Sequence, residues 1–411
     1  MNRSEIRSYI QEHGVAGFYD GLNKLLEGVD LPNGAKIKLA PRDFSIRELW
    51  EGMVGPIRET FDNPMWYREA GGALDPTGFP TATEKLISTI VIQQYNQYPG
   101  IADELVPETY EPKTLTERIP GFTFPETPKV ILPAEPYPTL GFADKFAAFE
   151  QAIHNKKEGM EVAVTEEAVR LDQTNQILRL AGDYGKSVRI ERERRTVRAV
   201  LGVGLDTGTA QNGVFFPSGT DTAMYRASEN NLRTDATPIF NHPGKTADSK
   251  LEDYTDLQEV LTVHARNITD DRQQTGGRPI MWNPDTLLAP VSLATTAANI
   301  LQATGIVYMA NLGTSTAPEI RHNAPNPLLN VFRGQMPMPF VSPYVDEVSA
   351  TVWVLFDRRS AFVRIQIFPF QVFRSPTGYA WNRDILVSVR VREWSRIVGL
   401  DFRYALRSNG A

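Results

Sequence analysis

The chain has 411 residues, of which 41% are hydrophobic and 22% are charged, and its formal net charge at pH 7 is −6. This composition is that of an ordinary globular protein, and the negative net charge argues against a protein that coats nucleic acid with its whole surface. The absence of cysteine excludes disulfides, thiolate metal sites and a cysteine nucleophile. No run of about 18 apolar residues is present and the start of the chain is polar, so we expect neither a membrane span nor a secretion signal.

The charge is unevenly distributed along the chain. From Arg358 to Ala411 there are ten arginines, no lysine and only three carboxylates, so this end is basic and the remainder is acidic. A planar guanidinium makes bidentate contacts to carboxylates and stacks on aromatic rings. The basic end is therefore suited to interfaces with acidic surfaces, including those of other copies of the same chain.

Residues 1–80 have the pattern of an arm. Amphipathic helical pieces broken by glycines come first, and Ser45-Ile-Arg-Glu48 is a capping box that opens a short helix. The rest is rich in proline, glycine and isolated aromatic residues, with too little periodicity to form a core of its own. We expect such an arm to bury its large apolar side chains, among them Trp50, Trp66 and Tyr67, against another subunit.

A long extended excursion follows. A helix is predicted over 83–95, and prolines recur every few positions through 108–140. Prolines at this density belong on edge strands and turns. After a mixed polar and aromatic stretch the chain returns to a strand near Glu161, so 134–164 is expected to leave the body as two strands. Its expected contacts with a neighbouring subunit are Tyr137, Phe142, Lys145, Phe146 and Phe149.

The rest of the chain is organised around the stretch from Gly159 to Gly202. Met160–Val164 suits a strand, and Thr165, followed by two glutamates, begins a helix. Apolar residues then recur at three- or four-residue spacing without any proline, which predicts one long amphipathic helix. Gly182 and Gly185 leave open the alternative of two shorter helices with a kink between them.

The second half of this predicted helix is dense in charge. Arg189 and Glu193, like Glu191 and Arg195, stand at the i,i+4 spacing that brings opposite charges together. One interpretation is a solvated helix face with weak ion pairs. The other is a face held against neighbouring chains or nucleic acid. The residues of this face are Arg189, Glu191, Arg192, Glu193 and Arg195.

Beyond Gly202 the pattern changes from loops and helices to strands. In the last predicted strand, Val387 and Val389 point to one side, while Arg390 and Arg392 point to the other. A proline and a glycine between the last two strands indicate a turn, so we expect a long hairpin beside the long helix. The predicted elements are loops with short strands over 203–250, helices over 257–267 and 285–304, and strands over 351–356, 362–368 and 384–392.

The sequence contains only partial matches to known catalytic and cofactor-binding motifs. The triplet at Gly244 lacks the upstream glycine of a phosphate-binding loop, because that position is Ile239. Gly202-Val-Gly204 resembles half of a dinucleotide-binding fingerprint but follows a predicted helix. The five histidines are scattered, without metal-ligand spacing. We therefore expect no catalytic, cofactor-binding or metal site. A metabolic enzyme of an unknown family is kept as an alternative.

The order of these parts resembles the major capsid proteins of tailed bacteriophages, particularly the Mu-like head proteins. The resemblance covers roughly 80–411 and lies in order and spacing. In the first half it is carried by the Glu135-Pro-Tyr-Pro138 excursion and by the return into Thr165–Gln173, which leads into the long helix. In the second half, Arg278–Pro290 looks like a wall of the family's axial domain, and Trp381–Arg392 looks like its closing strand.

The resemblance implies an α+β, Hong Kong 97-like capsid fold. Its implied parts are an N-terminal arm (1–80), the first part of a peripheral domain (81–133), an extended loop over an adjacent subunit (134–164), the spine helix of the peripheral domain (165–202), an axial domain (203–335), the peripheral sheet (336–395) and a C-terminal tail (396–411).

The function implied by the resemblance is assembly. Copies would form pentamers and hexamers, and these an icosahedral shell around packaged double-stranded DNA, contacted without sequence specificity. The implied partners are portal, scaffold and decoration proteins, with no membrane and no cofactor. The implied location is the virion, assembled in the host cytoplasm. With the chain starting at Met1, a separate scaffold protein is expected in place of a cleaved scaffolding region. An encapsulin-like shell around an enzyme cargo is the alternative of the same fold.

Replacing Phe142, Phe146 and Phe149 together by Ala is expected to leave the subunit folded and to impair shell closure. The reason is that these rings are predicted to lie on the excursion and not in the core. Circular dichroism follows folding and electron microscopy follows closure. Loss of the folded state would instead place the three rings inside the subunit.

Overall fold

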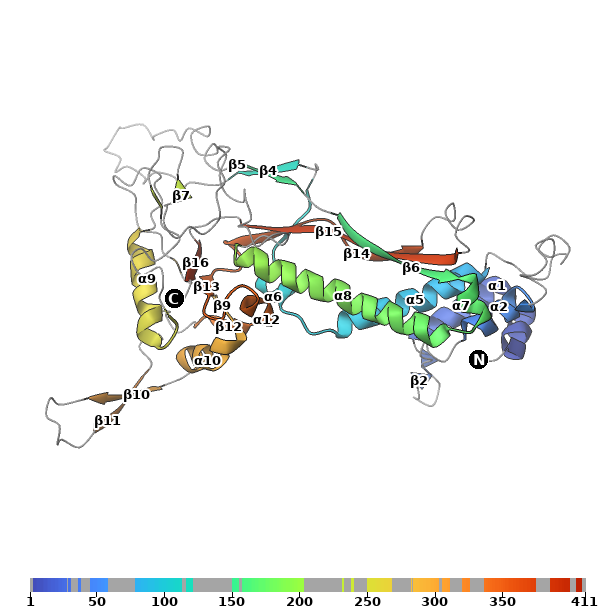
Figure 1. Cartoon of the computed structure of the whole chain (residues 1–411), viewed down its shortest axis with the longest axis horizontal. Helices are drawn as coiled ribbons and strands as arrows, with labels where there is room; N and C mark the ends of the chain where they lie inside the picture. The colour runs from blue at the N-terminus through green and yellow to red at the C-terminus, as the bar shows by residue number, and fades with distance from the viewer. Residues whose placement is uncertain are drawn as a thin grey trace, which may run out of the picture. The chain divides into compact units, whose positions relative to one another are not determined.

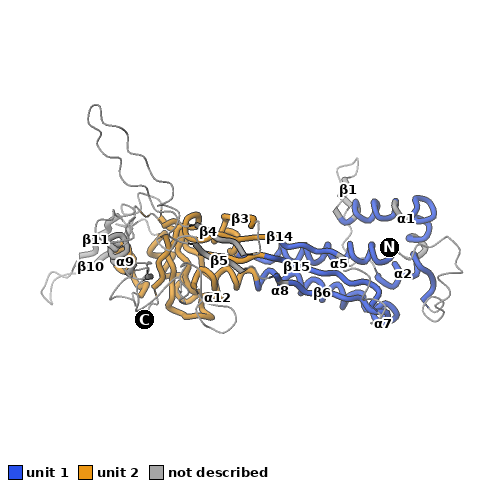
Figure 2. Tube along the Cα trace, turned by 90° about the horizontal axis from the view of Figure 1, so that it is seen from above, with its two compact units in different colours: residues 1–100, 157–191, 368–394 blue, residues 101–156, 192–367, 395–411 orange. Residues whose placement is uncertain are grey.

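The computed structural model describes residues 3–27, 29–30, 36–37, 45–57, 78–112, 116–120, 150–154, 157–202, 231–232, 238–239, 250–267, 282, 284–302, 305–310, 320–325, 336–374, 385–399 and 404–408. The chain separates into two compact units, each assembled from three segments that are distant in the sequence (Figure 2). Unit 1 comprises 1–100, 157–191 and 368–394, and unit 2 comprises 101–156, 192–367 and 395–411.

The described chain mixes helices and strands (Figure 1). The helices are α1 (Arg3–Glu27), α2 (Ile46–Met53), α5 (Gly78–Gln97), α6 (Ala102–Leu105), α7 (Glu166–Arg170), α8 (Thr174–Val200), α9 (Tyr254–Asn267), α10 (Ala294–Gln302), α12 (Pro343–Asp346) and the 3-10 helix η3 (Val291–Leu293). The strands are β1 (Val29–Asp30), β2 (Lys36–Ile37), β3 (Thr109–Tyr110), β4 (Thr116–Pro120), β5 (Glu150–His154), β6 (Lys157–Thr165), β7 (Asn231–Leu232), β8 (Pro238–Ile239), β9 (Thr286–Ala289), β10 (Gly305–Ala310), β11 (Ile320–Pro325), β12 (Met338–Val341), β13 (Trp353–Phe356), β14 (Phe362–Arg374), β15 (Ile385–Gly399) and β16 (Ala405–Ser408).

The strands group into larger and smaller sheets. Two sheets have four strands each, in the orders β3-β14-β15-β6 and β12-β9-β13-β16. The remaining described strands pair as β1-β2, β4-β5, β7-β8 and β10-β11. The predicted strands over 351–356, 362–368 and 384–392 are confirmed as β13, β14 and β15, and the predicted helices over 83–95 and 257–267 as α5 and α9. The turn predicted between β14 and β15 lies outside the described residues.

In unit 1 one face of a sheet packs against helices. Strand β15 pairs antiparallel with β6, and along β15 the side chains of Val387, Val389 and Val391 are buried. Val162 and Val164 of β6 are buried too, and all five valines belong to one hydrophobic cluster with residues of α5, α7 and α8. The predicted alternation of β15 is therefore confirmed, because its apolar row faces the helices and its polar row does not.

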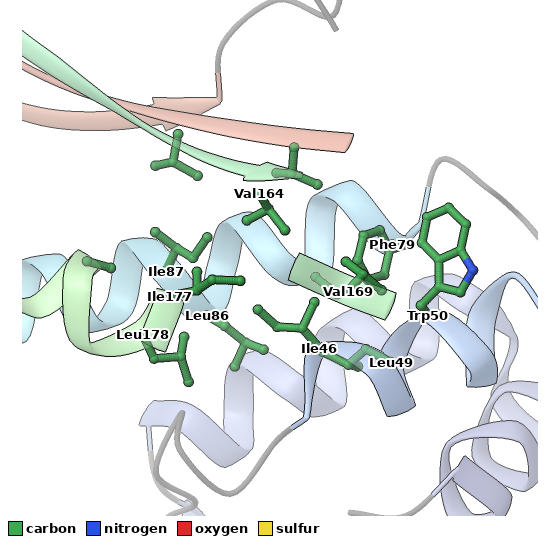
Figure 3. Close-up of a cluster of buried hydrophobic side chains, with 14 of the residues drawn as sticks. Ile46, Leu49, Trp50, Phe79, Leu86, Ile87, Val164, Val169, Ile177 and Leu178 are labelled. Carbon is green, nitrogen blue, oxygen red and sulfur yellow. The ribbon is translucent and has the colours of Figure 1, made fainter. Parts of the chain in front are cut away.

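The N-terminal helices are buried in the core of unit 1, although their sequence has weak periodicity. Helices α1 and α2 pack with α5, and the rings of Trp50 and Phe79 meet edge to face with centroids 4.8 Å apart (Figure 3). The predicted cap is confirmed, since Ser45 Oγ accepts a hydrogen bond from Glu48 N at 3.3 Å. Helix α1 is kinked at Gly14, whose φ is 72°. For the described residues up to 57, the buried apolar side chains are therefore covered by the same chain, where the sequence predicted contact with another subunit.

The predicted long helix is two helices, and the break is not at the glycines. Helix α7 ends at Arg170, and Asp172 adopts a φ of 50° before α8 begins. The Asp172 carboxylate accepts hydrogen bonds from the hydroxyls of Ser45 at 2.9 Å and Thr174 at 2.7 Å, and Thr174 Oγ1 in turn accepts one from Ile46 N at 2.9 Å. Contacts with α2 thus stabilise the break, which the local pattern does not reveal.

The start of α7 agrees with the sequence. Thr165 Oγ1 accepts a hydrogen bond from Ala168 N at 3.4 Å, as expected of an N-cap. Hydrogen bonds from the Glu167 backbone N–H and the Thr165 hydroxyl hold the pKa of the Glu167 carboxyl below its usual value. A carboxylate at this end of the helix is stabilised by the helix dipole as well.

Gly182 and Gly185 lie within α8 and mark a close approach to α5. A Cβ added at Gly185 would lie 2.4 Å from the carbonyl oxygen of Val91, and one added at Gly182 would lie 3.3 Å from Cγ of Gln94. The atom next to Gly185 belongs to the backbone, whereas the atom next to Gly182 belongs to a flexible side chain. The two glycines therefore serve packing between α5 and α8, and they do not kink the helix.

In unit 2 a segment predicted as helix contains a strand. Residues 286–289 form β9, which lies between β12, its parallel neighbour, and β13, its antiparallel one. All four residues are buried, and α10 starts only at Ala294, after Pro290 and the 3-10 turn. A short apolar run beside a helical pattern does not by itself distinguish a buried strand from a helix. Of the predicted helix over 285–304, only the part from Ala294 to Gln302 is an α-helix.

Gly185→Ala and Gly182→Ala form a matched pair that tests the close approach of α5 and α8. Alanine favours a helix over glycine by about 1 kcal/mol, so both changes would stabilise an isolated helix. At Gly185 the new Cβ would overlap a backbone carbonyl, and we expect the free energy of unfolding to fall by about 1–3 kcal/mol. At Gly182 we expect no loss. Denaturant unfolding of the purified variants measures both, and equal effects at the two positions would contradict the packing described.

Candidate subunit interface

Most residues expected at contacts between subunits lie outside the described part of the chain. These are Tyr137, Phe142, Lys145, Phe146 and Phe149 of the excursion and Trp66 and Tyr67 of the arm. The strands that flank 121–149 are described, and β4 pairs antiparallel with β5, from Thr116 opposite His154 to Pro120 opposite Glu150. The chain therefore leaves and returns as a two-stranded ribbon at this point.

Trp50 is placed differently from the expectation. Its side chain is 3% exposed and lies in the hydrophobic cluster of unit 1, close to Ile46, Leu49 and Phe79 (Figure 3). The sequence predicted that the indole ring contacts a second subunit, but residues of the same chain cover it. Trp50 is thus a core residue, because α2 places it on the side that faces α5.

The charged segment of α8 is partly buried within its own subunit. Glu193 is 2% exposed, and its Oε2 accepts hydrogen bonds from the backbone N–H groups of Ile101 and Ala102, both at 2.8 Å. These are N–H groups at the start of α6, which have no partner inside that helix. Glu193 therefore fixes the beginning of α6 against α8.

A carboxylate on α6 is shared by two arginines beside this contact. Asp103 Oδ1 pairs with Arg192 of α8 and with Arg364 of β14, the latter at 2.6 Å. The Arg364 side chain is 5% exposed and also donates a hydrogen bond to Ala102 O at 3.0 Å. A buried guanidinium needs a counter-charge, since moving it out of water is costly. Asp103 supplies that charge and joins α6, α8 and β14.

Other arginines of α8 pair with a glutamate or lie over an aromatic ring. Arg194 Nε lies 2.8 Å from Glu347 Oε2, and Arg198 Nη1 lies 3.7 Å from the same oxygen. In unit 1 the Arg189 guanidinium lies over the ring of Tyr95, 5.4 Å from its centroid. Of the predicted charged face, Arg192 and Glu193 therefore make contacts within the subunit, and contacts of this face with other chains or nucleic acid stay a prediction.

The sheet of unit 1 has an outward face with guanidinium and aromatic groups. Arg392 of β15 lies over the rings of Phe368 and Phe373 of β14, 4.4 and 4.3 Å from their centroids, and the Phe368 and Trp394 rings meet edge to face at 5.6 Å. Arg392 also donates two hydrogen bonds to Gln371 Oε1, at 3.3 and 3.2 Å. The alternation of β15 predicted that Arg392 faces away from the core, but the two phenylalanines were not singled out.

Within the described residues, no group of three or more histidine and acidic side chains is placed to hold a metal ion. In the same part of the chain, no helix combines the length and apolar character that a membrane span requires.

Asp103→Asn and Glu347→Gln compare the ion pair of Asp103 with the buried Arg364 to the more exposed ion pair of Glu347 with Arg194. Removing the Asp103 charge takes a counter-charge from the buried Arg364 guanidinium. We expect a loss of about 1–3 kcal/mol in the free energy of unfolding, below the value for a fully buried pair because Asp103 is half exposed. Removing the Glu347 charge is expected to cost about 0–1 kcal/mol. Urea unfolding of both variants tests this, and an equal loss would contradict a special role for Asp103.

Comparisons with known proteins identify the family of this chain. A family model described as "Phage capsid protein" matches residues 151–408. No curated protein matches the chain. Among solved structures, the virus-like particle from Pyrococcus furiosus matches with a TM-score of 0.40 and 10% identity, covering 78% of this chain and 96% of that one.

Two further solved structures show the range of similar proteins. The mature capsid of bacteriophage PhiM1 matches with a TM-score of 0.40 and 10% identity, covering 76% of this chain and 87% of that one. An encapsulin complex from Synechococcus elongatus matches with a TM-score of 0.37 and 11% identity, covering 74% and 85%. The family model spans α8, β14, β15 and the whole of the sheet built on β9 and β13. On that match, the chain belongs to the phage capsid protein family.

Proposed function

We propose that this chain is the major head protein of a tailed bacteriophage. In this proposal copies form pentamers and hexamers that close into an icosahedral shell of the Hong Kong 97 type around double-stranded DNA. The observation that carries the proposal is the family match over 151–408.

The arrangement of unit 1 supports the proposal. Helix α8 shares a hydrophobic cluster with α5 and with one face of the sheet of β6 and β15, which suits the spine helix and sheet of a peripheral domain (Figure 1). The opposite face carries Arg390 and Arg392 and the partly exposed rings of Phe368 and Trp394. Contacts spread over such faces are individually modest and together stable, as a closed assembly requires.

The proposed parts of the subunit follow the order expected from the sequence. Of the excursion over 134–164, the part before β6 would lie over an adjacent subunit, because β6 belongs to the sheet of unit 1. Residues 203–335 would contribute most of an axial domain. Within 336–395, β14 and β15 would supply the peripheral sheet, because β12 and β13 belong to the other four-stranded sheet. Residues of α1 and α2 belong to the core of unit 1. Residues 1–80 would therefore contact other subunits only through side chains that do not pack against α5.

Contact with DNA is proposed to be independent of sequence. The net charge of the chain is −6, so the subunit as a whole does not attract phosphate, and only local positive charge can serve such a contact. Phosphate contacts by arginine carry no sequence information. Portal, scaffold and decoration proteins are the remaining proposed partners, the virion is the proposed location, and assembly is proposed to take place in the host cytoplasm.

Purified protein examined by electron microscopy tests the proposal. We expect closed particles of uniform diameter, and particles from cells that replicate the phage are expected to contain genome-length DNA. Sedimentation over a range of salt concentrations gives the oligomeric state independently. Particles that enclose a protein cargo and no genome would favour an encapsulin-like shell. A small discrete oligomer in every salt would refute both shell functions and favour an enzyme.

A further inference from the structure

The outward face of the unit 1 sheet is basic, and its residues follow from the strand register. Arg390 stands opposite Glu161, Arg392 opposite Gly159 and Trp394 opposite Lys157. These three residues of β15 alternate with the buried valines, so their side chains lie on the face away from the helices. We call the residues Lys157, Arg390, Arg392, Phe368, Phe373 and Trp394 the basic face.

The charge of the basic face is only partly balanced by its own strands. Arg390 Nε lies 3.4 Å from Glu161 Oε2, and both side chains are about two-fifths exposed, at 41% and 39%. Lys157 is exposed, and Arg392 is held in place between two phenylalanine rings. Gly159, opposite Arg392, adds no side chain to the surface. The face therefore presents three cations against one carboxylate, with one guanidinium already fixed in position.

A second exposed surface of the same chain has the opposite charge. In unit 2 the carboxylates of Glu104, Glu108 and Glu111 are exposed, and Tyr110 beside them is 40% exposed. Strand β3, which contains Tyr110, is at the end of its sheet and pairs with β14 through residues including Arg364. We call Glu104, Glu108, Tyr110 and Glu111 the acidic edge. No ion pair to its three glutamates is found among the described residues.

We propose that the basic face of one subunit docks against the acidic edge of a second copy of this chain. Three carboxylates with an exposed tyrosine complement three cations with aromatic rings. Arginine in a fixed orientation is suited to bind carboxylates and to pack on an aromatic ring. A second copy is the occupant that the charges favour, because the chain itself presents the complementary surface. The inference rests on the proposed shell function, since only an assembly brings copies into regular contact.

Charge reversal on each surface tests the docking. The face variant is Lys157→Glu with Arg390→Glu, which leaves the packed Arg392 untouched. The edge variant is Glu108→Lys with Glu111→Lys. Each alone places like charges together, and we expect the protein concentration needed for assembly to rise about tenfold or more. Combining the four substitutions in one chain restores opposite charges and is expected to return assembly toward the wild-type concentration. Light scattering and sedimentation provide the measurements.

Matched controls separate this contact from a general effect of charge. Arg179→Glu with Lys186→Glu changes the net charge as the face variant does, but at exposed positions on α8. Glu12→Lys with Glu252→Lys does the same for the edge variant. We expect both controls to assemble near the wild-type concentration. Circular dichroism and thermal unfolding of every variant establish that the subunits are folded before assembly is compared.

Mixing the two single-surface variants distinguishes contacts between copies from contacts within one chain. The face variant has two acidic surfaces and the edge variant two basic ones, so each is expected to repel itself and to associate with the other. Assemblies of any shape in the mixture, with none in either variant alone, are the expected result. Rescue by the combined chain without rescue by the mixture would overturn the inference and place the contact within one subunit.

Two other results would overturn the inference while leaving the shell function intact. The first is normal assembly of the face variant with less nucleic acid in the particles, which would assign the basic face to DNA. The second is failure of both the combined chain and the mixture to assemble although every subunit is folded. If the wild-type chain itself forms no particles, it is the proposed shell function that fails, and that result is obtained before any variant is compared.

Discussion

The alternation of side chains along β15 is the constraint on which much of this structure depends. One row of valines is buried against α5, α7 and α8, and the other row carries arginine and tryptophan. A strand cannot exchange these rows without moving by one residue, which would bury charges and expose the apolar row. The same register that closes the core of unit 1 therefore also determines which groups the outward face presents.

Charge inside the subunit has a role different from charge on its surface. Glu193 accepts hydrogen bonds from backbone N–H groups at the start of α6. Asp103 of α6 balances the charge of the buried Arg364 guanidinium. Such contacts are costly to leave incomplete, because an unpaired buried charge is unfavourable. The cations of the basic face lie at the surface, where water and salt screen them. A surface contact of this kind can form and separate without disturbing the fold.

The sequence predicts those elements whose cause is local. The cap at Ser45, the cap at Thr165 and the alternation of β15 each depend on neighbouring residues, and all three are found in the structure. The break at Asp172 depends on Ser45, which is distant in the sequence, so helical periodicity did not reveal it. The sequence assigned Trp50 to an interface because 1–80 shows too little periodicity for a core, and the packing of Trp50 on Phe79 of another helix is not visible in that pattern. The candidate contact surfaces were predicted only as residue types, since the approach of Arg392 to two phenylalanines depends on how β14 and β15 pair.

The hydrophobic cluster of unit 1 extends in sequence from Ile6 to Val391. During synthesis the first helices emerge from the ribosome long before the valines of β15 that complete their packing, so the N-terminal part of a nascent chain has no finished core to dock into. Contacts of such high sequence separation form late, because the intervening chain has to be closed into a loop first. Nearly the whole polypeptide is thus required before unit 1 becomes a stable body. Truncated translation products would then lack the packed core of unit 1 and could not present the surfaces of a complete subunit.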